Sequence, residues 1–498
     1  MERIRNIVHC THIDLTRPLH LPSHGKRDEP PGHSAVAAEE VVPVRPTAVS
    51  IVALAVVTAA ASLSACGSGS GSSPDTVKVS FKQSMDNSVK VTDTYLAGIK
   101  KQFEKQYPGK KVELVPIKAS DADYYTKLQQ MLRSPRTAPD LVYEDTFLIN
   151  SDITSGYLKP LDSYLAKWKD WGQFIDTAKS AARGEDGKTY GVPDGTDTRG
   201  LWFDKRVFEK AGLPADWQPK NWDDVLAAAR TIKQKVPGVT PLNVYTGKAA
   251  GETASMQGFE MLLYGTNDGT SDPLYDKSSK KWIAGSQGFR DALSFVRTVY
   301  KDKLGPDVSD ALDPNYRNTV WGELMPQGKL GINLDGSWLP QNWLQGSGHE
   351  WPDWSRQLGL AYMPTQHGQA PGKVSMSGGW TWAIPAKAGN PDLAFDFIKT
   401  MQTKANAQKW YIANSGIAVR KDVASDPSYT SAQPGIKFFT DLVASTHYRP
   451  AYTAYPKVST AIQEAMESVT TGDASADKAA GTYDATLKDV TDGQVVTQ

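Results

Sequence analysis

The sequence contains little cysteine, few histidines and no excess of charge of either sign. Its 498 residues include 2 cysteines and 8 histidines, and 55 basic side chains balance 55 acidic ones. Two thiols form neither a disulfide framework nor a four-cysteine zinc site. The histidines that follow the first apolar run, His349, His367 and His447, are scattered along the chain, so we expect no metal and no cofactor. A net charge of zero argues against nucleic acid as a partner, because phosphate binding needs an excess of Lys and Arg.

A run long enough to cross a membrane is also missing. The apolar run Thr47–Leu63 is short and rich in Ala, Ser and Thr, with Arg45 before it and small residues after it. This pattern is typical of a secretory signal peptide. The tetrapeptide that ends it, Leu63-Ser64-Ala65-Cys66, resembles a bacterial lipobox, and that resemblance implies a diacylglyceryl group on Cys66. The alternative is a buried helix that happens to end in Cys.

Three regions therefore precede the body of the chain. Residues 1–46 form a leader extension with no assigned function, and we expect translation to begin near residues 41–44. Residues 47–66 form a lipoprotein signal peptide with its lipobox. Residues 67–74 form a Gly/Ser tether, since this composition gives a flexible chain with a reach of roughly 15 Å. We expect a lipid-anchored protein on the extracytoplasmic face of the cell membrane.

The body alternates strand and helix patterns. Val77, Val79 and Phe81 alternate with polar residues and predict a strand, and Leu96, Ile99 and Phe103 recur at helical spacing. Two further strands are predicted at residues 112–117 and 141–143, with a helix between them. A β-α-β-α-β order predicts a mainly parallel sheet with right-handed crossovers. The length of the chain favours two such lobes.

Six short motifs follow one another along this body. They are Pro139–Asp145, Gly156–Asp162, Gly187–Pro193, Leu201–Lys205, Asp335–Trp338 and Gly378–Trp380. Together they resemble the extracellular solute-binding proteins of sugar-importing ABC transporters, the maltose/trehalose-type group. The resemblance implies an α/β, two-lobed periplasmic-binding-protein-like (type II) fold with a hinged interlobe cleft. It places residues 75–195 and 364–415 in lobe 1, and residues 196–363 and 416–498 in lobe 2.

A sugar site needs hydrogen-bonding groups around the rim of the sugar and aromatic plates on its faces. Asp145 follows a strand at its carboxyl end, where ligands of α/β sheets bind, although it could instead cap a helix. The resemblance also implies a ligand-binding acid at Asp197, whose alternative is a hinge salt bridge or Asx-turn. Trp338 and Trp380 match positions that stack on sugar faces, and the alternative for each is a core residue. The other predicted ligand-binding residues are Asp86, Tyr245, Trp321 and Arg420.

The expected function is capture of a sugar or oligosaccharide and its delivery to the permease subunits of an ABC importer, by a monomer that is not an enzyme. The sequence contains no G-x-x-x-x-G-K-[ST] motif, so the ATPase is expected on another polypeptide. Two alternatives remain open. A secreted glycoside hydrolase would also carry tryptophans and paired carboxylates, and a cleft of this composition would also suit a non-sugar solute such as a polyamine.

Overall fold

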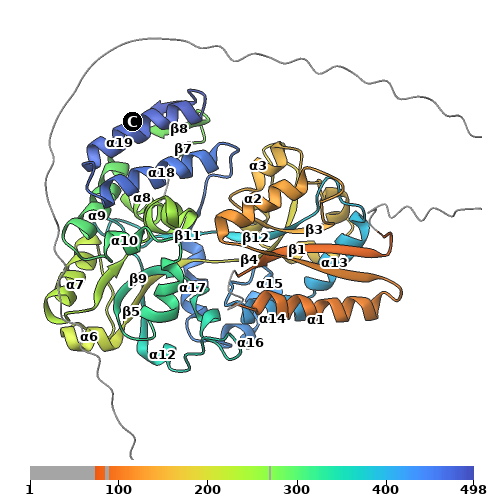
Figure 1. The fold of residues 1–498 in the computed structure, drawn as a ribbon, viewed down its shortest axis with the longest axis horizontal. Coiled ribbons are helices and arrows are strands. Elements are labelled where there is room, and N and C mark those ends of the chain that lie inside the picture. Colours follow the sequence, from red (N-terminus) through yellow and green to blue (C-terminus); the bar gives the residue numbers. More distant parts are fainter. Residues whose placement is uncertain (1–72, 85–88, 268–270) are drawn as a thin grey trace, which may run out of the picture. The chain divides into compact units, whose positions relative to one another are not determined.

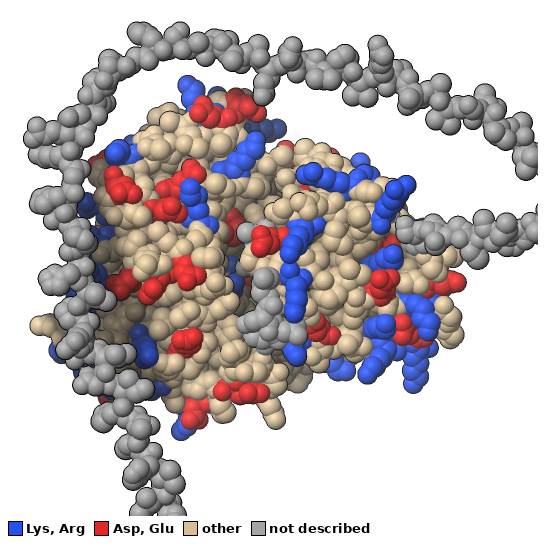
Figure 2. All heavy atoms as spheres, viewed as in Figure 1, with Lys and Arg blue, Asp and Glu red and all other residues tan. Residues whose placement is uncertain are grey.

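The computed structural model describes residues 73–84, 89–267 and 271–498. The predictions for the leader, the signal peptide, Cys66 and Asp86 lie outside these residues. Within the described part of the chain, no helix combines the length and the apolar character that a membrane crossing requires. Figure 1 shows the described elements, and Figure 2 shows acidic and basic side chains interspersed over one face.

The first lobe is built on a five-stranded sheet in the order β2-β1-β3-β12-β4. β1 pairs in parallel with β2 and with β3, in the β-α-β-α-β arrangement predicted from periodicity. β12 comes from far along the sequence and lies antiparallel between β3 and β4. The strands are β1 Thr76–Gln83, β2 Lys111–Lys118, β3 Leu141–Asp145, β4 Gly191–Thr196 and β12 Gly379–Ala383.

Helices cover this sheet because their apolar residues recur on one face. In the first crossover helix, Leu96, Ile99 and Phe103 are buried, as their spacing predicts. The helices are α1 Val91–Gln106, α2 Asp121–Leu132, α3 Ile149–Thr154, α4 Asp162–Leu165, α5 Asp176–Ala181, α13 Pro391–Met401, α14 Lys404–Ala413, α15 Lys421–Ala424 and α16 Pro427–Thr430, with the 3₁₀ turn η1 Lys169–Gln173.

The second lobe has a four-stranded sheet in the order β10-β5-β9-β6 and two small sheets. β5 pairs antiparallel with both β9 and β10, and β6 pairs in parallel with β9. The strands are β5 Arg199–Asp204, β6 Thr240–Asn243, β9 Leu330–Gly336 and β10 Leu358–Ala361. The small sheets contain β11 Ser375–Ser377 with β13 Thr446–Tyr448, and β14 Val495–Thr497 with β8 Lys281–Ala284 and β7 Tyr275–Asp276.

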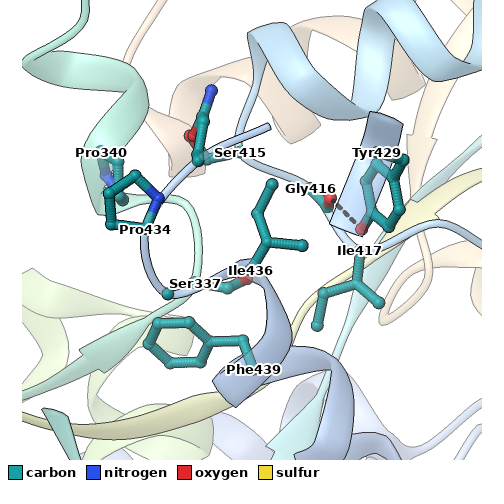
Figure 3. A pocket seen from close by; sticks show the side chains of 11 residues that line it. Ser337, Pro340, Ser415, Gly416, Ile417, Tyr429, Pro434, Ile436 and Phe439 are labelled. Atoms are coloured by element: carbon teal, nitrogen blue, oxygen red, sulfur yellow. Dashed lines mark hydrogen bonds between the residues drawn. The ribbon is translucent and has the colours of Figure 1, made fainter. Parts of the chain in front are cut away.

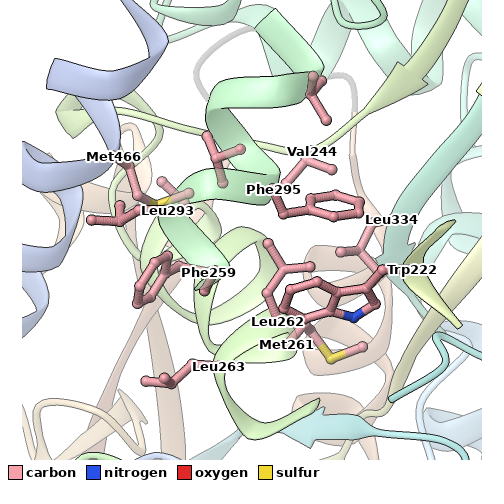
Figure 4. Close-up of a cluster of buried hydrophobic side chains, with 14 of the residues drawn as sticks. Trp222, Val244, Phe259, Met261, Leu262, Leu263, Leu293, Phe295, Leu334 and Met466 are labelled. Carbon is pink, nitrogen blue, oxygen red and sulfur yellow. The ribbon is translucent and has the colours of Figure 1, made fainter. Parts of the chain in front are cut away.

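The core of the second lobe joins helices from both ends of its sequence. Figure 4 shows Trp222, Phe259, Phe295 and Met466 in this core, from four different helical segments. The α-helices are α6 Lys205–Ala211, α7 Trp222–Lys235, α8 Met261–Leu263, α9 Gln287–Lys301, α10 Val308–Ala311, α11 Tyr316–Thr319, α12 Trp354–Gln357, α17 Ile436–Leu442, α18 Tyr455–Thr470 and α19 Ala476–Val490. The π-helical segments are η3 Thr253–Glu260 and η5 Val320–Leu324, and the 3₁₀ turns are η2 Lys248–Ala250, η4 Tyr264–Thr266, η6 Leu339–Asn342 and η7 Val443–Ser445.

The packing of two segments differs from the lobe boundaries expected from sequence. Val374 and Met376 join the core of the second lobe, so the segment 364–377 packs there and not in lobe 1. Val419 and Val423 join the core of the first sheet, so the chain just beyond residue 417 packs in lobe 1. In each case, buried apolar side chains determine the lobe in which the segment packs. The short sequence motifs carry no information about these contacts.

A small cavity lies beside the connecting segments between the lobes. Thr196, at the end of β4, pairs with Ile417, so two of the connections run side by side. A cavity of about 10 Å³ lies beside them, between Ser337 and Phe439 of the second lobe and the connecting residues 415–417 (Figure 3). A volume of this size accommodates about one water molecule, so this cavity is not a sugar site.

Candidate functional site

An aromatic surface forms where β3 of the first lobe ends and β12 begins. Trp380 on β12 pairs in register with Asp145 on β3. Its ring stacks on Tyr143, with centroids 4.7 Å apart and planes 10° apart, and Tyr125 lies 6.2 Å away. Trp380 remains only half-buried. We call Tyr125, Tyr143, Asp145, Phe147 and Trp380 the first wall of the site. It offers an aromatic plate beside a carboxylate.

Asp145 is the acid of the first wall, as its place at the carboxyl end of a strand predicts. Its Oδ1 accepts a hydrogen bond from the backbone N–H of Phe147 at 3.0 Å, and its Oδ2 accepts one from the Tyr125 hydroxyl at 2.9 Å. The guanidinium of Arg449 lies 2.9 Å from Oδ1. Burial raises the pKa of Asp145 above its ordinary value, and Arg449 partly offsets that rise. The carboxylate is therefore held in a fixed orientation.

Hydrogen-bonded and charged groups of the second lobe gather around the end of β9. Asp335, at the end of β9, accepts from the Tyr245 hydroxyl and from the side-chain amide of Gln257, both at 3.0 Å. Two guanidinium groups approach the ring of Trp338, Arg199 at 4.7 Å and Arg317 at 5.6 Å from the ring centre. These six residues form the second wall. Tyr245 is buried and its hydroxyl is engaged by Asp335, whereas Trp338 is half-buried.

Asp197 lies at the first connection between the lobes. It forms an ion pair with Arg199 and accepts a hydrogen bond from the backbone N–H of Gly378 at 2.8 Å. A Cβ atom placed on Gly378 would lie 3.2 Å from Arg449 and 3.6 Å from Asp197. The structure therefore brings Asp197 and the Gly378–Trp380 motif together with Arg449, beside Asp145.

Arg449 is a residue of the site that the sequence reading missed. It follows β13 and lies between the lobes, where it contacts Asp145 at 2.9 Å and Glu252 at 2.8 Å. Burial disfavours the charged form, but these two carboxylates outweigh that effect and raise the pKa of Arg449. One sequence signal was available, a basic residue directly before Pro450 at the end of a short strand.

Two further residues predicted to bind ligand are buried among other side chains. Arg420 is 2% exposed, and its guanidinium pairs with Asp170 and Asp422 in the first lobe. Trp321 is 6% exposed and packs in a buried cluster, where its indole N–H donates to Asn318 at 3.3 Å. The structure does not bring either side chain beside Asp145. Within the described residues, no group of His, Cys, Asp and Glu could hold a metal ion.

The fold and this interlobe site define a class of protein, a two-lobed binding protein. Residues 88–408, more than half of the chain, match the family described as bacterial extracellular solute-binding protein. The chain therefore belongs to the family of bacterial extracellular solute-binding proteins. Members of this family bind substrates and do not convert them, so the prediction that the chain is not an enzyme is confirmed.

Individual proteins agree with this assignment. A protein of Brucella abortus that is named as a binding protein is 26% identical over 402 residues, which cover 80% of this chain and 88% of that protein. The melibiose/raffinose/stachyose-binding protein of Bacillus subtilis is 24% identical over 298 residues, 58% of this chain and 64% of that protein. The GacH receptor of Streptomyces glaucescens, solved unliganded and with acarbose, has a TM-score of 0.70 at 22% identity and covers 83% of this chain and 98% of its own. The structural likeness confirms the predicted two-lobed α/β fold.

Proposed function

We propose that the chain is a lipid-anchored, extracytoplasmic binding protein that captures a sugar or oligosaccharide and delivers it to an ABC importer. The observation that carries this proposal is the half-buried indole of Trp380 beside the oriented carboxylate of Asp145. An aromatic plate suits the C–H face of a sugar, and a charged acceptor suits its hydroxyls.

The charges of the site favour an uncharged ligand. Arg449 pairs with Asp145 and with Glu252, and Arg199 pairs with Asp197. Because these acids already have a cation beside them, a polyamine would have to displace arginine side chains before its own charges were paired. A sugar hydroxyl can instead donate to a carboxylate that keeps its cation, since a carboxylate has about four acceptor sites.

Similar proteins add support of a general kind. The relative in Bacillus subtilis is named for melibiose, raffinose and stachyose, and the structurally similar receptor was solved with acarbose. The chain shares their family or fold, which favours a saccharide as its ligand.

The anchor and the importer complete the proposal. The Leu63–Cys66 tetrapeptide favours lipidation of Cys66, and the Gly/Ser segment after it favours a body that stands away from the membrane. We expect the body to act as a monomer that offers its ligand-bound form to the permease. In cells, Cys66→Ala should move the protein from the membrane fraction to the soluble fraction, and unchanged fractionation would remove the anchor from the proposal.

Calorimetry with a panel of neutral oligosaccharides tests the binding function. We expect one saccharide class to bind one to one, with no product formed and with little change in affinity between low and high salt. If spermidine binds with an affinity that falls steeply as salt rises, and no saccharide binds, then the ligand is a polyamine and not a sugar. Release of shorter sugars during the titration would contradict a role in capture alone.

A further inference from the structure

A single guanidinium joins carboxylates of both lobes. Arg449 donates from Nη1 to Oε2 of Glu252 at 2.8 Å, and from Nη2 to Oδ1 of Asp145 at 2.9 Å. Nη2 also donates to Oγ1 of Thr146 at 2.9 Å. Glu252 directly precedes η3 of the second lobe, whereas Asp145 ends β3 of the first. The side chain of Arg449 is only 7% exposed, so water screens these contacts weakly.

Glu252 is held in place by its own lobe. Its Oε1 accepts from the hydroxyl of Ser255 at 3.1 Å and from that of Ser459, and its Oε2 also accepts from Tyr455 at 3.3 Å. Ser459 and Tyr455 lie on α18. Because these donors belong to the second lobe, Glu252 can keep Arg449 oriented when the lobes separate. The bonds from Arg449 to Asp145 and Thr146 are the ones that opening must break.

The same segment makes a second contact with the first lobe nearer the surface. The backbone N–H and the hydroxyl of Thr453 contact Glu185 at 3.1 and 3.0 Å, and its hydroxyl lies 2.9 Å from that of Thr154. These groups are exposed, so each contact is exchanged readily for water and stabilises the closed form little. Of the contacts that this segment makes with the first lobe, those of Arg449 are the buried ones.

We propose that Arg449 couples the occupation of Asp145 to lobe closure: carried by Glu252, it binds Asp145 when the lobes meet and thereby stabilises the closed form before any ligand arrives. A ligand whose hydroxyl groups donate to Asp145 then binds beside this guanidinium. The role of the ligand rests on the proposed function, whereas the contact between Arg449 and Asp145 does not.

Removal of either Arg449 or Asp145 should shift the equilibrium of the two lobes toward the open form. In the closed form, Asp145 without Arg449 is a buried carboxylate that has lost its cation, which is strongly unfavourable. In the open form, water reaches Asp145 and the loss matters little. The ligand-free equilibrium should therefore shift toward the open form, by roughly tenfold or more in the ratio of open to closed molecules.

Single-molecule energy transfer on the ligand-free protein measures this ratio. The full chain carries Cys10→Ser and Cys66→Ser, with dyes on Lys101→Cys of the first lobe and Lys210→Cys of the second, both exposed positions. We expect Arg449→Met to raise the open fraction. Asp145→Asn should raise it as well, because it breaks the same contact from the other lobe, and the double variant should open little further than either single one.

Arg420→Met is the matched control. Arg420 is also buried and also binds two carboxylates, but both of them belong to the first lobe. It should lower the melting temperature and leave the energy-transfer distribution unchanged. If Arg449→Met does not fold, Asp145→Asn carries the same test. Distributions of both variants that match the wild type would overturn the proposal, whereas a protein that opens as expected but binds no saccharide would overturn only the proposed function.

Discussion

The two walls of the site are built from different chemistry. The first wall is aromatic, and Trp380 stacks on Tyr143 with ring centroids 4.7 Å apart. The second wall is polar, and the ring of Trp338 lies near the guanidinium groups of Arg199 and Arg317. From the sequence alone the two tryptophans look alike, because each follows a short glycine motif. Under the proposed function, we expect the indole of Trp380 to serve as a sugar plate, whereas the indole of Trp338 lies among charged groups.

Two buried acids at the walls, Asp335 and Asp194, differ in whether a cation lies beside them. Burial raises the pKa of Asp335, an acid of the second wall, and Arg317 partly offsets that rise. Asp194 lies behind the first wall, on β4, and accepts from the side-chain amide of Gln402 at 2.7 Å. Burial raises the pKa of Asp194 to about 7, opposed only by hydrogen bonds. The first wall thus rests on an acid that is protonated below neutral pH.

The largest expected effect follows from Asp194. Its pKa is about 7 in the folded protein and about 3.9 in an unfolded chain, so the folded state binds one more proton between these values. The free energy of unfolding therefore falls as pH rises from about 4 to 7, by roughly 4 kcal/mol from this group. Asp194→Asn should remove that part of the pH dependence. Melting temperatures at pH 4.5, 6 and 7.5 measure the change in slope.

Asp176→Asn is the control for this measurement, since the Asp176 side chain is 90% exposed. It should leave the slope as in the wild type. A slope that Asp194→Asn leaves unaltered would show that Asp194 is ionised in the folded protein, and the contrast between the acids of the two walls would then be lost.

Local patterns predicted the first wall better than the second. The alternation in β1 and β3 and the helical spacing of α1 are properties of short segments, and Asp145 follows from the end of a strand. The insertion of β12 between β3 and β4 depends on pairing between residues far apart, which no local pattern encodes. The roles of Arg449 and Arg420 could not be predicted from local sequence for the same reason. Only the folded structure shows that Arg449 has partners in both lobes, whereas the partners of Arg420 lie in one.

The two tryptophans should differ in binding. Trp380→Ala removes the plate of the first wall and should weaken saccharide affinity by about 30-fold, or about 2 kcal/mol. Trp338→Ala should weaken it by less than about fivefold, since guanidinium groups already lie near that ring. Calorimetry with the same saccharide measures both values, and circular dichroism checks the fold. Equal losses from the two variants would contradict the division of roles between the walls.

Two glycines test the walls without removal of an aromatic ring. A Cβ on Gly336 would overlap the six-membered ring of Trp338, so Gly336→Ala must displace that indole, and we expect a loss of about 1–3 kcal/mol in unfolding free energy. A Cβ on Gly378 would lie 3.2 Å from the end of Arg449, 3.4 Å from the end of Met256 and 3.6 Å from Asp197, the last an ordinary contact. These flexible ends can move, so Gly378→Ala should cost less than about 1 kcal/mol in stability but reduce saccharide affinity. Denaturant unfolding and calorimetry separate the two effects. A Gly336→Ala protein as stable as the wild type would mean that Trp338 is free to move, and the second wall would then be an adaptable surface instead of an ordered one.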